Sequence, residues 1–241
     1  QVASLTSTQV SNLDSSQLVA LTSSQAGALT SSQLAVITTA GLVAMETQDV
    51  GNLSASALVG LTTAQAAVLT AEEVVAFGST KLSGLSSTNV ASLNTAVIAG
   101  LTTGQVASLT STTVRSLSSA QLVALTSVQA GVLTSAQLAV ISADNLAVME
   151  TSDVGNLSSA ALAGLTTAQA GVLVSSAVVA LGSAKLAVLS SANISKLSTA
   201  VIANLTTAQV GGLTTAQVAS LTSTQVSNLD SSQLVALTSS Q

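Results

Sequence analysis

The stretch "LTSTQVSNL" at residues 5–13 has the sequence features of a helix start. Thr6 followed three residues later by Gln9 is the pattern of a capping box. In this motif the Thr hydroxyl accepts from the backbone N–H of the Gln, and the Gln side chain reaches back to the cap. Leu5 and Val10 then fall at the two positions of a hydrophobic staple. The stretch therefore predicts a helix that begins at residue 7.

The same eight-residue unit, or octad, runs through the whole sequence without a slip. With Leu5 as position 1, every eighth residue up to Leu237 is large and apolar, and 25 of these 30 are Leu. Position 2 is Thr, Ser, Asp or Asn in 25 octads, position 5 is Gln or Glu in 16, and position 6 is always aliphatic. Because the capping and staple positions recur together, a new helix start is predicted in each octad.

The eight-residue period decides between fold classes. In a continuous α-helix, position 1 would drift by about 80° per octad, so no apolar face would form. In one flat strand, positions 1 and 6 would lie on opposite faces. A β-solenoid with a turn inside each octad is the alternative, but such turns favour Gly, Asn and Asp, whereas the octads use Thr, Ser and Gln. We therefore predict an all-α solenoid of very short capped helices.

One octad cannot fold alone. Its two aliphatic side chains contribute about 1.5–3 kcal/mol each on burial, whereas ordering each of its eight backbone units costs about 1–2 kcal/mol. Stacking on other octads must supply the rest, and the small residues common at positions 7 and 8 allow backbones to approach closely. This is the logic of a solenoid. One, two or three octads per coil all fit the pattern.

Two longer periods overlie the octads. "METQDVGNL" at residues 45–53 returns as "METSDVGNL" at residues 149–157, which is 104 residues later. Residues 217–241 repeat residues 1–25 without a difference, which is 216 residues later. We interpret residues 1–241 as a single continuous repeat array and expect it to be a window of a longer tandem protein.

Composition argues against several classes of function. The sequence has no Pro, Cys, His, Trp or Tyr, and its only cations are Lys81, Arg115, Lys185 and Lys196. Nucleic-acid binding needs a basic surface, so it is not expected. A membrane span needs about 20 mainly apolar residues in a row, and polar residues interrupt every octad. Catalysis needs an activated nucleophile, paired acids or a metal. We expect no enzyme activity, because the abundant hydroxyls already serve as caps.

Two acids stand out because they occupy positions 2 and 5 of one octad and recur 104 residues later. They are Glu46 and Asp49, repeated as Glu150 and Asp153. An Asn follows three residues after each Asp, so these oxygen side chains are weak candidates for a Ca²⁺ site. We favour the simpler interpretation, in which both acids stabilise the positive N-terminal end of a short helix. No metal or cofactor is therefore predicted, with Ca²⁺ as the alternative. Glu72 and Glu73 have no acidic counterpart in the second half, which argues against a site there.

Two lysines also recur with the 104-residue period. Lys81 and Lys185 replace Gln at position 5, each after a Gly at position 2, Gly78 or Gly182, which we interpret as a helix cap. They follow the two acidic octads by four octads. A solvated lysine is the simpler interpretation, and a periodic contact between coils or filaments through opposite charges is the alternative.

The LTxxQVxxL octads resemble those of very long repetitive bacterial surface or secreted proteins. The resemblance covers the whole chain and implies a structural role outside the cell, as a stalk, adhesin shaft, matrix or filament subunit. It transfers no catalytic residues.

Only 5% of residues are charged, and low net charge favours association. We predict a structural protein that self-associates into an extracellular or cell-surface filament, fibre or sheath. The alternative is an adhesin stalk or a binding module with a glycan- or ice-binding, hydroxyl-rich surface.

Overall fold

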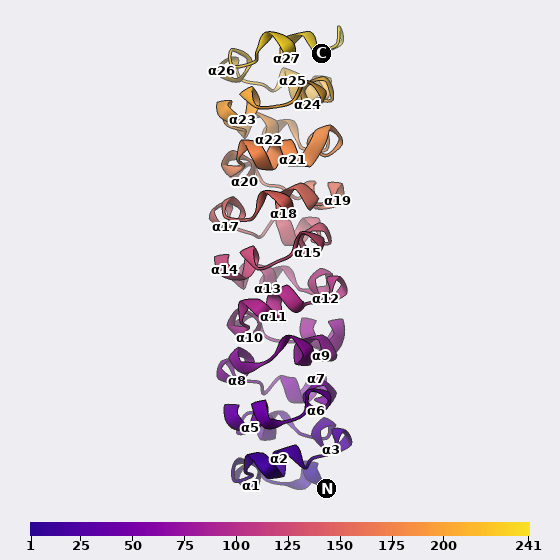
Figure 1. The fold of residues 1–241 in the computed structure, drawn as a ribbon, viewed down its shortest axis with the longest axis vertical. Coiled ribbons are helices and arrows are strands. Elements are labelled where there is room, and N and C mark those ends of the chain that lie inside the picture. Colours follow the sequence, from indigo (N-terminus) through magenta and orange to yellow (C-terminus); the bar gives the residue numbers. More distant parts are fainter. The chain divides into compact units, whose positions relative to one another are not determined.

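A computed structural model describes all residues, 1–241, and its regular secondary structure is entirely helical. One short 3₁₀ turn and 27 α-helices follow one another along the chain, and there is no β-strand (Figure 1). The predicted all-α class is therefore confirmed, and the β-solenoid alternative is wrong.

The chain forms two compact units, Gln1–Ala124 and Leu125–Gln241. The octad pattern crosses this boundary without a slip. The first unit contains η1 (Val2–Ser4), α1 (Ser7–Ser11), α2 (Ser15–Val19), α3 (Ser23–Gly27), α4 (Ser31–Leu34), α5 (Thr39–Ala44), α6 (Thr47–Asn52), α7 (Ala55–Leu58), α8 (Thr63–Val68), α9 (Ala71–Ser83), α10 (Ser87–Ser92), α11 (Thr95–Gly100), α12 (Thr103–Ser108), α13 (Ser111–Ser116) and α14 (Ser119–Val123).

The second unit has the same kind of short helices. It contains α15 (Ser127–Gly131), α16 (Ser135–Leu138), α17 (Ala143–Ala147), α18 (Thr151–Asn156), α19 (Ser159–Leu162), α20 (Thr167–Val172), α21 (Ser175–Leu186), α22 (Ser191–Lys196), α23 (Thr199–Ala203), α24 (Thr207–Gly211), α25 (Thr215–Ala219), α26 (Ser223–Val226) and α27 (Ser231–Val235).

Capping boxes start these helices as predicted. In α12 the Thr102 hydroxyl accepts from the Gln105 N–H at 3.2 Å, and Gln105 Oε1 accepts from the Thr102 N–H at 3.0 Å. The helix ends where the Leu109 N–H donates to the Val106 carbonyl at 3.2 Å and the backbone becomes extended. Position 1 of one octad therefore ends one helix, and position 2 caps the next.

Three consecutive octads make one coil of the solenoid. In the first unit α1 packs on α4, α2 on α5 and α3 on α6; in the second, α15 packs on α18, α16 on α19 and α17 on α20. Within each unit the coils lie as successive layers of short helices (Figure 1). The contacts join octads 24 residues apart, which fixes the coil size that the sequence left open.

The core of each unit consists mainly of the position-1 and position-6 side chains, with apolar position-5 residues such as Val97 also buried, while the caps at position 2 are largely exposed. Coils approach closely at positions 7 and 8. A Cβ added to Gly60 would lie 2.0 Å from the Ser31 carbonyl oxygen, and one added to Gly164 would lie 2.1 Å from that of Ser135. Small residues at these positions therefore permit backbone contact between coils, as the sequence predicted.

Two longer helices depart from the octad rule. In α9, Gly78 has φ 68° and ψ 176°, and in α21, Gly182 has φ 73° and ψ 173°. Each Gly has non-helical φ and ψ and joins two separate helical segments within its element. Positive φ at these positions suits glycine, which has no Cβ. Each Gly directly precedes the second helical segment of its element, which agrees with the interpretation of these glycines as helix caps.

None of the helices combines the length and the apolar character that crossing a bilayer requires.

Candidate functional site: the position-5 side chains

The position-5 side chain connects each coil to the coil before it. Gln65 Oε1 accepts from the Thr62 N–H at 2.8 Å, which completes a capping box. Its Nε2 donates to the carbonyl oxygens of Leu34 and Ile37, both at 2.7 Å. One amide therefore binds the start of its own helix and the end of a helix one coil earlier.

Such bonds recur along each unit, and we call this series the glutamine ladder. Its members in the first unit are Gln33, Gln65, Gln105 and Gln121. Its members in the second unit are Gln169, Gln209, Gln217, Gln225, Gln233 and Gln241.

Asparagine makes the same kind of contact where it replaces glutamine. Asn89 Nδ2 donates to the Leu61 carbonyl at 2.8 Å, and Asn193 Nδ2 donates to that of Leu165 at 2.9 Å. The ladder is buried, so an unmade bond there would leave a carbonyl without a donor, which costs about 1–3 kcal/mol. The sequence analysis assigned position 5 only the capping role and missed this second one.

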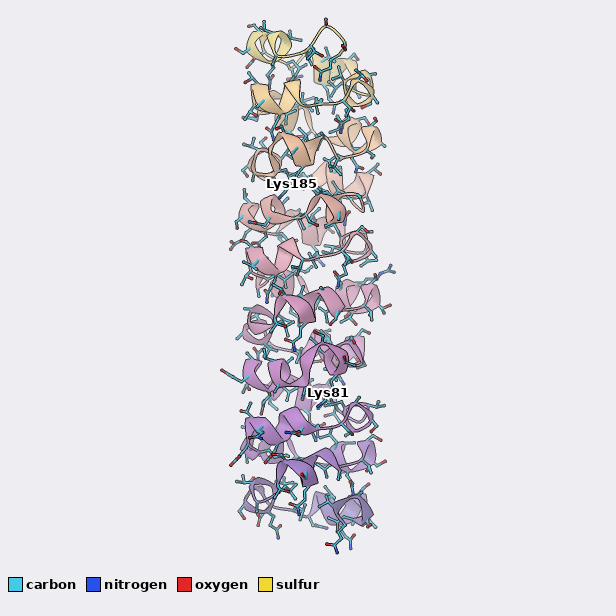
Figure 2. All side chains as sticks on the ribbon, turned by 90° about the vertical axis from the view of Figure 1, so that its right-hand side faces the viewer. Lys81 and Lys185 are labelled. Carbon is cyan, nitrogen blue, oxygen red and sulfur yellow. The ribbon has the colours of Figure 1, made fainter.

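The two lysines lie in the ladder position. Lys81 Nζ donates to the Gly51 carbonyl on α6 at 2.7 Å, and Lys185 Nζ donates to the Gly155 carbonyl on α18 at 2.6 Å. Figure 2 labels both side chains on the ribbon. A cation at the C-terminal end of a helix is favourable. The solvated-lysine interpretation was therefore wrong: each lysine contacts the preceding coil, through a carbonyl rather than an acid.

Asp49 and Asp153 also occupy the ladder position and are buried, with 3% and 2% of their surface exposed. Neither donates to the preceding coil. The Ser23 hydroxyl donates to Asp49 Oδ1 at 2.7 Å, and the Ser127 hydroxyl donates to Asp153 Oδ1 at 2.8 Å. Asp153 Oδ2 is buried without a hydrogen-bond partner. At these two positions the preceding coil supplies the donor and the position-5 side chain accepts, which is the reverse of the bonds that the glutamines make.

Burial raises the pKa of Asp153 above its ordinary value, because desolvation disfavours the carboxylate. The negative charge of Glu150 raises the pKa further. Hydrogen bonds from the hydroxyls of Ser127 and Ser152 act in the opposite direction.

The other residues of the candidate Ca²⁺ site do not face the buried Asp side chains. Glu46 and Glu150 are exposed N-cap residues whose side chains make no capping bond. Asn52 and Asn156 each donate to the carbonyl four residues earlier, at 2.8 and 2.9 Å. The carboxylates and amides therefore do not converge, and no three His, Cys, Asp or Glu side chains are grouped to hold a metal.

The remaining acidic pair has a local role. Glu73 Oε2 accepts from the Thr70 N–H at 2.7 Å and completes a capping box, while Glu72 is exposed. Neither unit contains a ligand-sized pocket. The chemistry of the chain is thus concentrated in hydrogen bonds between coils.

Comparison with known families finds a repeat model that is similar to parts of the chain. The model of the ALTTAQ repeat matches residues 42–79, 146–183 and 186–223, which together are just under half of the chain. Each match begins at position 6 of an octad, and the first two begin 104 residues apart. The chain is therefore a tandem-repeat protein similar to this family over those stretches. No curated protein matches the chain.

Proposed function

We propose that this chain is a non-catalytic structural protein whose octad solenoid assembles into an extracellular or cell-surface filament, fibre or sheath. The glutamine ladder carries the proposal. Each coil supplies the donors that satisfy the carbonyls of the coil before it, so coils can be added without changing the contact. An array that needs neighbours on both faces suits a scaffold better than a reaction site.

The surface also supports association. Only 5% of residues are charged, and valines such as Val59 and Val128 are largely exposed. Weak charge repulsion favours contact between copies. The exposed residues of each octad are otherwise mostly Ser, Thr, Gly and Ala, which lose little side-chain entropy when two surfaces meet.

Negative-stain electron microscopy of the purified chain over a range of concentrations tests the proposal. We expect elongated assemblies that lengthen or thicken as concentration rises. A matched variant carrying Val59→Glu and Val128→Glu adds two negative charges at exposed positions to a net charge of −5, so it should assemble less while keeping its helical circular dichroism. Dispersed monomers at every concentration would contradict self-assembly.

The location is tested separately. Antibody labelling of intact and permeabilised cells of the source organism should give equal signals if the protein lies outside the cell. A signal only after permeabilisation would contradict an extracellular role. Glycan-array binding without assembly would favour the adhesin-stalk alternative.

A further inference from the structure

Asp153 interrupts the glutamine ladder of the second unit. Ladder glutamines there donate to the position-1 carbonyl 28 residues earlier, as Gln169 does to Ile141 and Gln217 to Leu189, both at 2.7 Å. The same offset from Asp153 leads to Leu125. An ionised carboxylate has only acceptor oxygens, so it cannot make this bond.

The groups packed against Asp153 do not neutralise it. α18 packs on α15 and on α21. α15 carries no charged residue and offers the Ser127 hydroxyl. Lys185 is the only charged residue of α21, and its Nζ donates to the Gly155 carbonyl. On its own element Asp153 has only the negative Glu150 at the N-cap, and Asp144 on the preceding α17 is exposed.

We propose that Asp153 is a proton-operated contact between coils. Ionised, its carboxylate leaves the Leu125 carbonyl without the ladder donor. Protonated, its Oδ2–H donates to the coil before it in the way that a ladder amide does. The inference rests on the proposed structural role and gives the array a site that acid tightens and neutral pH loosens.

The buried, unpartnered Oδ2 is the atom that would carry this proton. The raised pKa of Asp153 agrees with this assignment. A group whose pKa is higher in the folded state stabilises the fold when protonated. That stabilisation is complete below the ordinary value of 3.8 and is lost as pH rises through the raised pKa.

Asp14 provides an internal contrast. The Ser16 hydroxyl is the main cause that lowers the pKa of this exposed N-cap, followed by the Gln17 N–H. Acid therefore weakens the Asp14 cap. Asp14 and Asp153 act in opposite directions, so the pH dependence must be measured as a difference between wild type and a variant at one position.

Urea unfolding of the full chain and of Asp153→Asn between pH 4 and pH 8 tests the proposal. Asn at position 5 is compatible with the fold, because Asn193 makes a ladder bond there. At pH 8 the variant should be more stable, and wild type should approach it as pH falls. Each unit by which the pKa is raised corresponds to a tenfold change in the unfolding equilibrium.

Asp14→Asn serves as the matched control: the lowered pKa of Asp14 places its titration below the ordinary value of 3.8, so the stability difference from wild type should stay nearly constant between pH 4 and pH 8. A difference between wild type and Asp153→Asn that is constant with pH, or that favours wild type at pH 8, would overturn the proposal. Electron microscopy of the same samples scores assembly separately. Filaments without the pH dependence would refute only this inference, and the pH dependence without filaments would refute only the proposed assembly.

Discussion

Residues 1–25 and 217–241 have the same sequence but opposite surroundings. Leu18 is 1% exposed, whereas its counterpart Leu234 is 46% exposed. Gln17 is exposed, whereas its counterpart Gln233 is 1% exposed. Within residues 1–241, the first stretch contacts only the coil that follows it, and the second contacts only the coil that precedes it.

The contrast shows that the two faces of a coil differ. The position-6 side chain is covered by the coil that follows, and the position-5 amide is buried by the coil that precedes. The helix starts are the same in both stretches, because Thr6 and Thr222 each begin a helix with a complete capping box. Local sequence therefore sets the helices, and neighbours three octads away set the burial.

Truncating the position-6 side chain should give the largest difference in unfolding free energy between the two stretches. Leu18→Ala removes a fully buried side chain and should cost about 2–5 kcal/mol of unfolding free energy. Leu234→Ala changes an identical octad whose leucine is half exposed, so we expect less than about 1 kcal/mol. Urea unfolding followed by circular dichroism measures both. Equal losses would contradict the assignment of position 6 to the following coil.

Closing the gap between coils should have the next largest effect. Gly60→Ala places a Cβ 2.0 Å from the Ser31 carbonyl oxygen and must push two coils apart, at about 1–3 kcal/mol. Gly104→Ala is the control, because its Cβ meets nothing closer than 3.5 Å and it lies within helix α12. The control should gain stability, by about 0.5–1 kcal/mol. A thermal scan in which both variants melt alike would refute backbone contact between coils.

Replacing the ladder amide with a carboxylate tests the polar face. Gln233→Glu keeps an oxygen for the Asp230 N–H but loses the donors to the Ile202 and Leu205 carbonyls, at 3.1 and 2.7 Å. We expect a loss of about 1–3 kcal/mol. In a chain of residues 1–241, Gln17→Glu alters the same octad at an exposed position 5 and should be nearly neutral. The comparison fails if both variants lose stability equally in urea.

Removing the N-cap hydroxyl should cost the same unfolding free energy in both stretches. Thr6→Ala and Thr222→Ala each remove a hydroxyl that accepts from the N–H of a Gln three residues later, at 3.2 Å in both. Each should cost about 1 kcal/mol. Thermal unfolding of the two variants should therefore differ by much less than the leucine pair. A large difference would mean that the caps also depend on neighbouring coils.

Most of the local fold could be predicted because its determinants lie within one octad. Thr6 and Gln9 are three residues apart, so their bonds follow from the sequence pattern. The coil size could not be predicted, because the bonds that set it join residues 28 and 31 apart, as from Gln65 to Ile37 and Leu34. The octads are so alike that the pattern favours no particular pairing.

The candidate sites were less predictable for a related reason. Asp49 and Lys81 look like exposed helix residues until the preceding coil is placed beside them. One signal for the ladder was present: position 5 is Gln in 15 octads and Glu only at Glu73. Glu suits a helix N-terminus at least as well, so the excess of Gln indicates a need for the amide donor.

The uncovered position-6 face has a consequence for synthesis. A ribosome releases the N-terminal octads first, and each new coil covers the apolar side chains of the one made before it. The growing chain therefore exposes the apolar face of only its latest coil, however long the array becomes. Exposed hydrophobic surface makes incompletely folded chains prone to aggregate. Because only the latest coil exposes its apolar face, the tendency of the nascent chain to aggregate should not grow with the length of the array.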